Sequence, residues 1–190
     1  MSSRGLRFNN HWQVEGKHAF LGASKYHWIR YDLEKMKTIW SNKFKSERGT
    51  RLHKFAAEAI ALKIRMPKND QTLNRYINDA IGFRMSPEVV LFYNDDCFGT
   101  ADALSFEKRI LRVHDLKTGV HAGSFDQPKI YCALFCLEYG INPYDIEMIM
   151  RIYQNDQVFE EIADPEEVKQ IMDTIVLFTK EIEIMREVME

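Results

Sequence analysis

The stretch GTADALSFEKRILRVHDLKTG, residues 99–119, decides the fold because it predicts two β-strands joined by a tight, charged turn. A turn centred on residues 108–109 sets the register, so that opposed residues have numbers adding up to 217. A two-residue or four-residue loop gives this register, and a three-residue loop does not. Asp102 then faces Asp115 across the ladder, and Lys117 lies on the same face. The hairpin is therefore apolar near its turn and ionic at its open end.

The opposed carboxylates of Asp102 and Asp115 are the unusual feature of this hairpin. Directly opposed Cβ atoms lie roughly 5 Å apart, and like charges repel each other at that distance. A divalent cation between the two would turn repulsion into attraction, and ligation by oxygen alone favours Mg²⁺ or Mn²⁺. The alternative is a solvated strand end at which Lys117 neutralises Asp115. On the hairpin alone, both interpretations stay open.

Around this hairpin, the hydrophobic period changes from helical to strand-like midway through the chain. Ser24 resembles a helix N-cap, and Pro67 ends the helical pattern of the N-terminal third. The order of elements predicts an α/β fold with a mixed central sheet flanked by helices. The expected helices are residues 32–46, 47–65, 70–83, 126–139 and 164–188, and the expected strands are 87–93, 98–106, 110–117 and 146–154.

Length and composition predict one globular domain over residues 1–190, in which residues 1–15 form a loose arm. Hydrophobic residues make up 45% of the chain and charged residues 28%, which excludes a disordered protein. No apolar run approaches the roughly 20 residues that span a bilayer, and the N-terminus lacks the apolar core of a secretory signal. We therefore expect a cytoplasmic protein that has no membrane partner. The three cysteines follow no zinc or disulfide spacing, which favours reduced thiols.

Charge is distributed unevenly along the chain, although the net charge is only −2. Residues 1–68 hold 15 Lys and Arg against 5 Asp and Glu, whereas the remainder holds 11 against 23. This asymmetry fits a basic surface that binds a polyanion, and it fits equally well two halves that attract each other.

Three motifs in series give the chain a resemblance to a known family. Asp102 followed by Asp115-Leu116-Lys117 resembles the core of the PD-(D/E)xK nucleases. Upstream, GTRLH at residues 49–53 is similar to the Gly-x-x-x-His motif of their RecB-type exonuclease branch, and downstream QPKIY at 127–131 is similar to its Gln-x-x-x-Tyr motif. With the leading FLGASKYHWIRYD, the resemblance covers roughly residues 20–155. It implies a restriction-endonuclease-like core similar to that of small phage-encoded RecB-like nucleases.

The resemblance also implies roles for particular residues. Asp102, Asp115, the Leu116 carbonyl and His53 would hold one or two Mg²⁺ or Mn²⁺ ions, and Lys117 would orient a water molecule or neutralise a phosphate. Gln127 and Tyr131, one helical turn apart, would contact DNA and support the site. Some relatives carry an iron–sulfur cluster on four cysteines, but Cys97, Cys132 and Cys136 are too few and wrongly placed, so no cluster is expected.

Two further acids stand at the margin of this pattern. Glu58 follows His53 by five residues rather than the four found in many relatives, which rotates it away from the histidine's face. Glu88 lies at the start of the expected strand 87–93, where it could reach the metal through water, although a solvated strand end is the simpler interpretation.

The expected function is metal-dependent hydrolysis of DNA, first of all by an exonuclease. The alternatives are a catalytically silent nucleic-acid-binding or assembly module on the same fold, and a structure-selective endonuclease or junction resolvase. DNA is the expected partner, and a second copy of the chain or a recombination or replication protein is a further one. Cleavage polarity, strand preference and pathway stay open.

Overall fold

The computed structural model describes residues 12–14, 16–119 and 123–189, and the chain forms two compact units, residues 1–47 and 48–190. The predicted arm over residues 1–15 lies mostly outside the described residues. The first unit contains two 3₁₀ segments, η1 (Trp12–Val14) and η2 (Ala23–Arg30). Gly22 is the N-cap of η2, so the prediction of a helix capped by Ser24 is wrong.

A single helix, α1 (Leu33–Ala61), replaces the two helices expected over residues 32–46 and 47–65. Gly49 does not interrupt it, because a helix tolerates a lone glycine at a modest cost. The helix ends at Ala61 rather than at residue 65. Lys63 there adopts a left-handed backbone with φ of 56°, and the Ile64 N–H donates to the Ala59 carbonyl at 2.8 Å, which closes the helix end.

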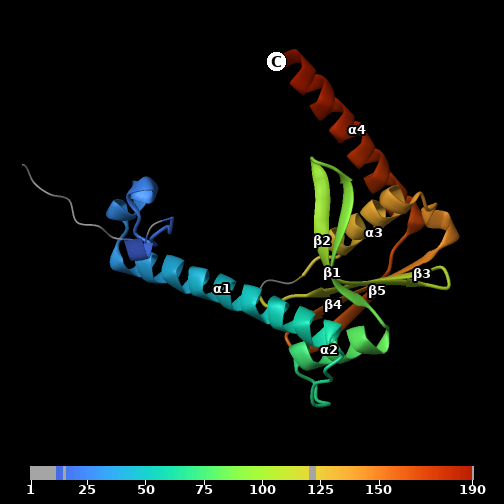
Figure 1. The fold of residues 1–190 in the computed structure, drawn as a ribbon, viewed down its shortest axis with the longest axis horizontal. Coiled ribbons are helices and arrows are strands. Elements are labelled where there is room, and N and C mark those ends of the chain that lie inside the picture. The colour runs from blue at the N-terminus through green and yellow to red at the C-terminus, as the bar shows by residue number, and fades with distance from the viewer. Residues whose placement is uncertain (1–11, 15, 120–122, 190) are drawn as a thin grey trace, which may run out of the picture. The chain divides into compact units, whose positions relative to one another are not determined.

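The sheet has five strands in the order β1-β2-β3-β4-β5, and only β3 and β4 run parallel. This is an α/β fold with a mixed sheet packed against helices, as the order of elements predicted (Figure 1). No helix among the described residues is long and apolar enough to cross a membrane. The strands are β1 (Ser86–Asn94), β2 (Cys97–Glu107), β3 (Ile110–Leu116), β4 (Glu147–Gln154) and β5 (Gln157–Ile162), and the remaining helical elements are α2 (Thr72–Gly82), α3 (Asp126–Tyr139), η3 (Pro143–Asp145) and α4 (Pro165–Met189).

The predicted register of the β2–β3 hairpin is confirmed. Its five described pairs run from Ala103–His114 to Glu107–Ile110, and the numbers of each pair add up to 217. Lys108 and Arg109 form the two-residue turn, with φ angles of 53° and 63°. Two consecutive left-handed residues give the turn the twist that matches its strands.

Strand β5 was not predicted, although it forms a similar hairpin with β4. Asn155 and Asp156 make this turn with φ angles of 51° and 59°, and both residue types favour a left-handed backbone. The burial pattern of β5 explains the omission, because only every third of its positions is partly buried and the rest are exposed. Its hydrophobic alternation is therefore weak.

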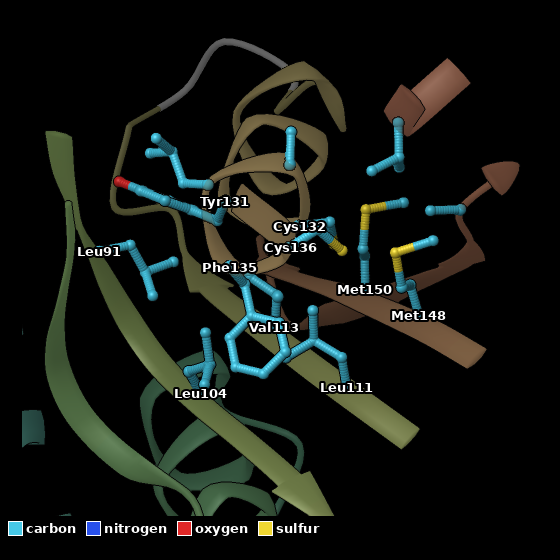
Figure 2. Close-up of a cluster of buried hydrophobic side chains, with 14 of the residues drawn as sticks. Leu91, Leu104, Leu111, Val113, Tyr131, Cys132, Phe135, Cys136, Met148 and Met150 are labelled. Atoms are coloured by element: carbon cyan, nitrogen blue, oxygen red, sulfur yellow. The ribbon is translucent and has the colours of Figure 1, made fainter. Parts of the chain in front are cut away.

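Two hydrophobic cores cover opposite faces of the sheet in the unit of residues 48–190. The larger core packs α3 and α4 against the strands, and Figure 2 shows Cys132, Cys136 and Phe135 facing Val113 and Met150. The buried thiols confirm that these two cysteines are core residues. The smaller core packs α1 and α2 against β2, β3 and β4. Its buried members are Ala56, Ala59, Ile60, Tyr76, Ile77, Ala80, Met85, Ala103, Leu116 and Tyr153.

Candidate metal centre

Strands β2 and β3 part at Asp102, one step beyond the last described pair of their ladder. Beyond that pair, the Asp102 side chain accepts a backbone hydrogen bond from the neighbouring strand: its Oδ2 accepts the N–H of Leu116 at 2.8 Å. Its Oδ1 lies 3.1 Å from Nδ1 of His53, which projects from α1. The sequence predicted that Asp102 would oppose Asp115 across a continuous ladder. In the structure, Asp102 instead links α1 to β3.

Three potential metal ligands from three different elements gather at this point. One ligand atom each of His53 (α1), Glu88 (β1) and Asp102 (β2) lies within 4.8 Å of the other two. The hydrogen bond to Asp102 is the main cause that raises the pKa of His53, and the charges of Asp102, Asp115 and Glu88 raise it further, while burial opposes them. Partial burial, followed by the charge of Asp102, raises the pKa of Glu88. Negative charge thus exceeds positive charge within this group.

Glu88 reaches the group through an irregular backbone. Its φ is +50°, a left-handed value inside a β-strand, where a side chain with a Cβ atom is strained. Its neighbours Pro87 and Val89 pair with Ala103 and Ala101, so Glu88 lies at the level of Asp102. Glu88 is exposed, as expected of a strand end, and its carboxylate nevertheless lies close to His53 and Asp102. The alternating pattern of the strand gave no sign of the backbone irregularity.

Asp115 lies beside this group and is held by Lys117 rather than included in it. The Asp115 side chain is only 4% exposed. The Lys117 Nζ donates a hydrogen bond to its Oδ1 at 3.0 Å and lies 3.0 Å from its Oδ2 without a hydrogen bond to that atom. Burial nevertheless raises the pKa of Asp115, Lys117 opposes that effect, and the charge of Asp102 adds to it. Asp115 is thus affected by the negative charge of Asp102, although only Asp102 belongs to the three-residue group.

The Gln-x-x-x-Tyr motif on α3 positions Lys117. Gln127 Oε1 accepts a hydrogen bond from the Lys117 ammonium at 2.7 Å, and Gln127 Nε2 donates to the Tyr131 hydroxyl at 3.0 Å. That hydroxyl donates to the backbone carbonyl of Thr100, two residues before Asp102, at 2.7 Å. Tyr131 is buried, so its role is to join α3 to β2. A DNA contact by Gln127 and Tyr131 stays a prediction.

Two glycines allow the elements around the site to approach closely. A Cβ atom on Gly49 would lie 2.7 Å from the Thr118 hydroxyl, just after Lys117. A Cβ atom on Gly99 would lie 3.0 Å from the ring of Tyr131. The Gly49-to-His53 spacing of the sequence motif therefore has a steric reason, because the glycine lets α1 lie against the end of β3 while the histidine reaches Asp102.

The remaining predicted residues have a less direct place. Leu116 contributes its N–H to Asp102 and its side chain to the smaller core, while ligation by its carbonyl stays a prediction. Glu58 is exposed on α1 and outside the group, in line with its five-residue offset from His53. Comparisons of the chain with protein-family models, curated proteins and solved structures gave no match.

A second polar cluster lies among α2, β3 and β4 and is built differently. The Tyr153 hydroxyl donates to Asp79 at 2.9 Å and lies 3.2 Å from Nδ1 of His114. Arg151 lies 3.3 Å from the same Asp79 carboxylate. Burial, helped by the charges of Arg151 and Arg112, lowers the pKa of His114 to about 3. This histidine is therefore neutral. The one carboxylate of this second cluster, Asp79, and its guanidinium, Arg151, are paired with each other.

Proposed function

We propose that residues 48–190 form a divalent-metal-dependent nuclease of the PD-(D/E)xK type, with a restriction-endonuclease-like core of the RecB branch, that hydrolyses phosphodiester bonds in DNA. The observation that carries the proposal is the convergence of His53, Glu88 and Asp102 from three separate elements. An exonuclease is the preferred form of the activity.

The donor set fits a divalent cation. Two carboxylates and one imidazole suit Mn²⁺ and Mg²⁺, and the histidine makes the site somewhat softer than oxygen ligands alone. Such an ion, when bound, supplies a Lewis acid that lowers the pKa of water and neutralises charge on a phosphate. Without a cation, the two carboxylates share only one imidazole, and Glu88 holds a strained backbone. Strain and unbalanced charge at the same point indicate a functional site.

Lys117 is placed to act on the substrate. An ammonium has three hydrogens, and Asp115 and Gln127 accept two of those of Lys117. The third is available to a phosphate oxygen or to the attacking water. In the net reaction, the water oxygen bonds to phosphorus, the ester P–O bond breaks, and a hydroxyl and a phosphate monoester result. Lys117 would stabilise the negative charge that develops on the phosphate oxygens.

The test uses purified full-length protein with linear and closed-circular DNA in Mg²⁺ or Mn²⁺. We expect loss of linear DNA that EDTA abolishes, and no loss with Asp102→Asn. Asp95→Asn, in the exposed β1–β2 turn, is the matched control and should retain activity. Cleavage of the circular substrate as well would indicate an endonuclease, because an exonuclease needs an end.

A metal titration separates the nuclease from a silent binding module. Calorimetry with Mn²⁺ should detect binding to the wild type and to Asp95→Asn, and weak or no binding to Asp102→Asn and Glu88→Gln. A wild type that cleaves DNA in neither metal, with DNA binding that survives Asp102→Asn, would favour the silent module.

A further inference from the structure

A basic groove follows the C-terminal end of α2, and none of the candidate metal-centre residues lines it. It consists of two open hollows of about 750 and 430 Å³ that share Gly82 and Phe83. Six bases line the two hollows: Arg65, Lys68 and Arg75 the larger one, and Arg84, Lys108 and Arg112 the smaller one.

The acids of this groove are already neutralised. Asp79 is bound by Arg151, Asp70 lies 3.9 Å from Arg75, and Glu107 lies 3.9 Å from Arg84. Among the described residues, no carboxylate lies within 4 Å of the other four bases of the groove, which leaves the groove with a net positive charge. These four are Arg65, Lys68, Lys108 and Arg112.

The backbone shows that basic side chains are kept here against local preference. Arg84 and Lys108 have φ angles of 55° and 53°, where glycine or asparagine is favoured. The β4–β5 hairpin makes its turn with Asn155 and Asp156, the residue types that such a turn prefers. Lys108 therefore occupies a position at which asparagine or aspartate makes the corresponding turn of the same sheet, while Lys63 shows that a lysine also adopts this conformation outside the groove.

Arg112 is also fixed in place. Its guanidinium lies over the Phe83 ring, 4.9 Å from the centroid, and the Arg151 guanidinium lies at the same distance from that ring. A stacked guanidinium loses little freedom when it binds an anion, and its planar fork matches the geometry of a phosphate.

We propose that this groove binds the phosphate backbone of a nucleic-acid strand away from the scissile bond; the inference rests on the proposed nuclease function and names where the substrate is held. The unit of residues 48–190 contains 17 Lys and Arg against 24 Asp and Glu, so as a whole it repels DNA. The two carboxylates of the candidate metal centre, Glu88 and Asp102, are part of that negative charge. Attraction must come from local positive charge, and an elongated double hollow with four unpaired bases suits successive phosphates of one strand.

The experiment measures binding of fluorescently labelled oligonucleotides, single-stranded and duplex, by anisotropy in EDTA at several salt concentrations. The groove variant combines Lys68→Gln with Lys108→Asn, because asparagine tolerates the left-handed turn position. The control removes two charges elsewhere, with Lys63→Asn at another left-handed position and Lys180→Gln on α4. Lys63 and Lys180 line neither hollow.

The groove variant should bind about tenfold or more weakly, and its slope of log Kd against log salt should fall by about one to two, since each lost phosphate contact removes about 0.7 to 0.9. The control variant should bind like the wild type. Equal slopes in the groove variant and the wild type, or equal losses in both variants, would overturn the inference. Groove-dependent binding to phosphatidylserine vesicles but not to oligonucleotides would also overturn it.

The same proteins separate this inference from the proposed function. A wild type that cleaves DNA, with a groove variant that binds and cleaves equally well, refutes the groove alone. A wild type that binds through the groove but cleaves in neither metal refutes the nuclease alone.

Discussion

Two histidines in the unit of residues 48–190 lie beside charged side chains in two different arrangements. His114 is neutral and lies beside Tyr153, which also satisfies Asp79 and thereby joins a paired network, although the buried Nε2 of His114 has no hydrogen-bond partner among the described residues. His53 stands against two carboxylates that it cannot balance alone. The first arrangement stabilises the fold, because buried polar groups are costly unless they are hydrogen-bonded. The second has a net negative charge, which is what a site for a cation requires.

The largest contrast is expected when one acid is removed from each cluster, Asp102 from the metal group and Asp79 from the cluster around Tyr153, and cleavage and melting temperature are compared. If the proposed function holds, Asp102→Asn should lower DNA cleavage at least ~10³-fold, about 4 kcal/mol of lost transition-state stabilisation, because a proposed metal ligand is lost. Its melting temperature should not fall, because the repulsion by Glu88 and Asp115 is relieved and the amide oxygen still accepts the N–H of Leu116.

Asp79→Asn should do the reverse, with a lower melting temperature and no loss of cleavage per folded molecule, because the proposed groove then gains positive charge. Cleavage assays and thermal unfolding on both variants make the comparison. A destabilised Asp102→Asn, or an inactive Asp79→Asn that is folded, would remove the distinction between the clusters.

Acid should affect the two histidines with opposite sign. The pKa of His114 is about 3 in the folded protein, against 6.5 when it is unfolded. As the pH falls below 6.5, the unfolded state takes up a proton that the folded state refuses, so stability is lost at about 1.4 kcal/mol per pH unit until roughly pH 3. The raised pKa of His53 gives a contribution that is complete below 6.5 and is lost as the pH rises through its folded pKa.

Denaturant unfolding in EDTA, as a function of pH, tests both signs. His114→Gln should flatten the acid limb, and His53→Gln should remove a loss of stability above pH 6.5. An acid limb that is identical in the wild type and His114→Gln would contradict the assigned protonation states.

Tyr153→Phe tests the paired network by removing one hydroxyl. Asp79 keeps Arg151, but the buried Nδ1 of His114 loses its described neighbour, so we expect a loss of about 1–3 kcal/mol of unfolding free energy. Cleavage and Mn²⁺ binding by the folded variant should match the wild type. A variant with full stability would show that the hydroxyl is not needed there.

Glu88→Asn should give the smallest change in unfolding free energy, and this change should be an increase. Asparagine accepts a left-handed backbone better than glutamate does, and the repulsion by Asp102 is removed, so the unfolding free energy should rise by about 0.5–1 kcal/mol. Mn²⁺ binding and cleavage should nevertheless fall. A variant that is less stable and still binds Mn²⁺ would show that Glu88 has a structural role only.

The hairpin could be predicted in detail from the sequence because a two-residue turn and an alternating face leave one register. The same argument failed one step later, at Asp102, because the ladder ends where the carboxylate takes a backbone N–H. A pattern of side chains does not show such an exchange between backbone and side-chain hydrogen bonds.

Glu88 could not be predicted as a member of the site for a related reason. Its position depends on one φ angle of +50°, and no residue nearby is of a type that favours it. His53 was predicted from the family resemblance. Its contact with Asp102 depends on the spacing between Gly49 and His53, which hydrophobic periodicity does not reveal. Strand β5 was missed because most of its side chains are exposed.

The close approaches at Gly49 and Gly99 have a consequence for the life of the chain. The first brings α1 to the end of β3, and the second brings α3 to β2, so the arrangement of the metal group together with Lys117 draws on segments from residue 49 to residue 131. During synthesis, a ribosome-bound chain that has not yet released α3 has the acids but no fixed lysine. The newborn protein therefore completes this arrangement of side chains late, after strands β1, β2 and β3 have been synthesised.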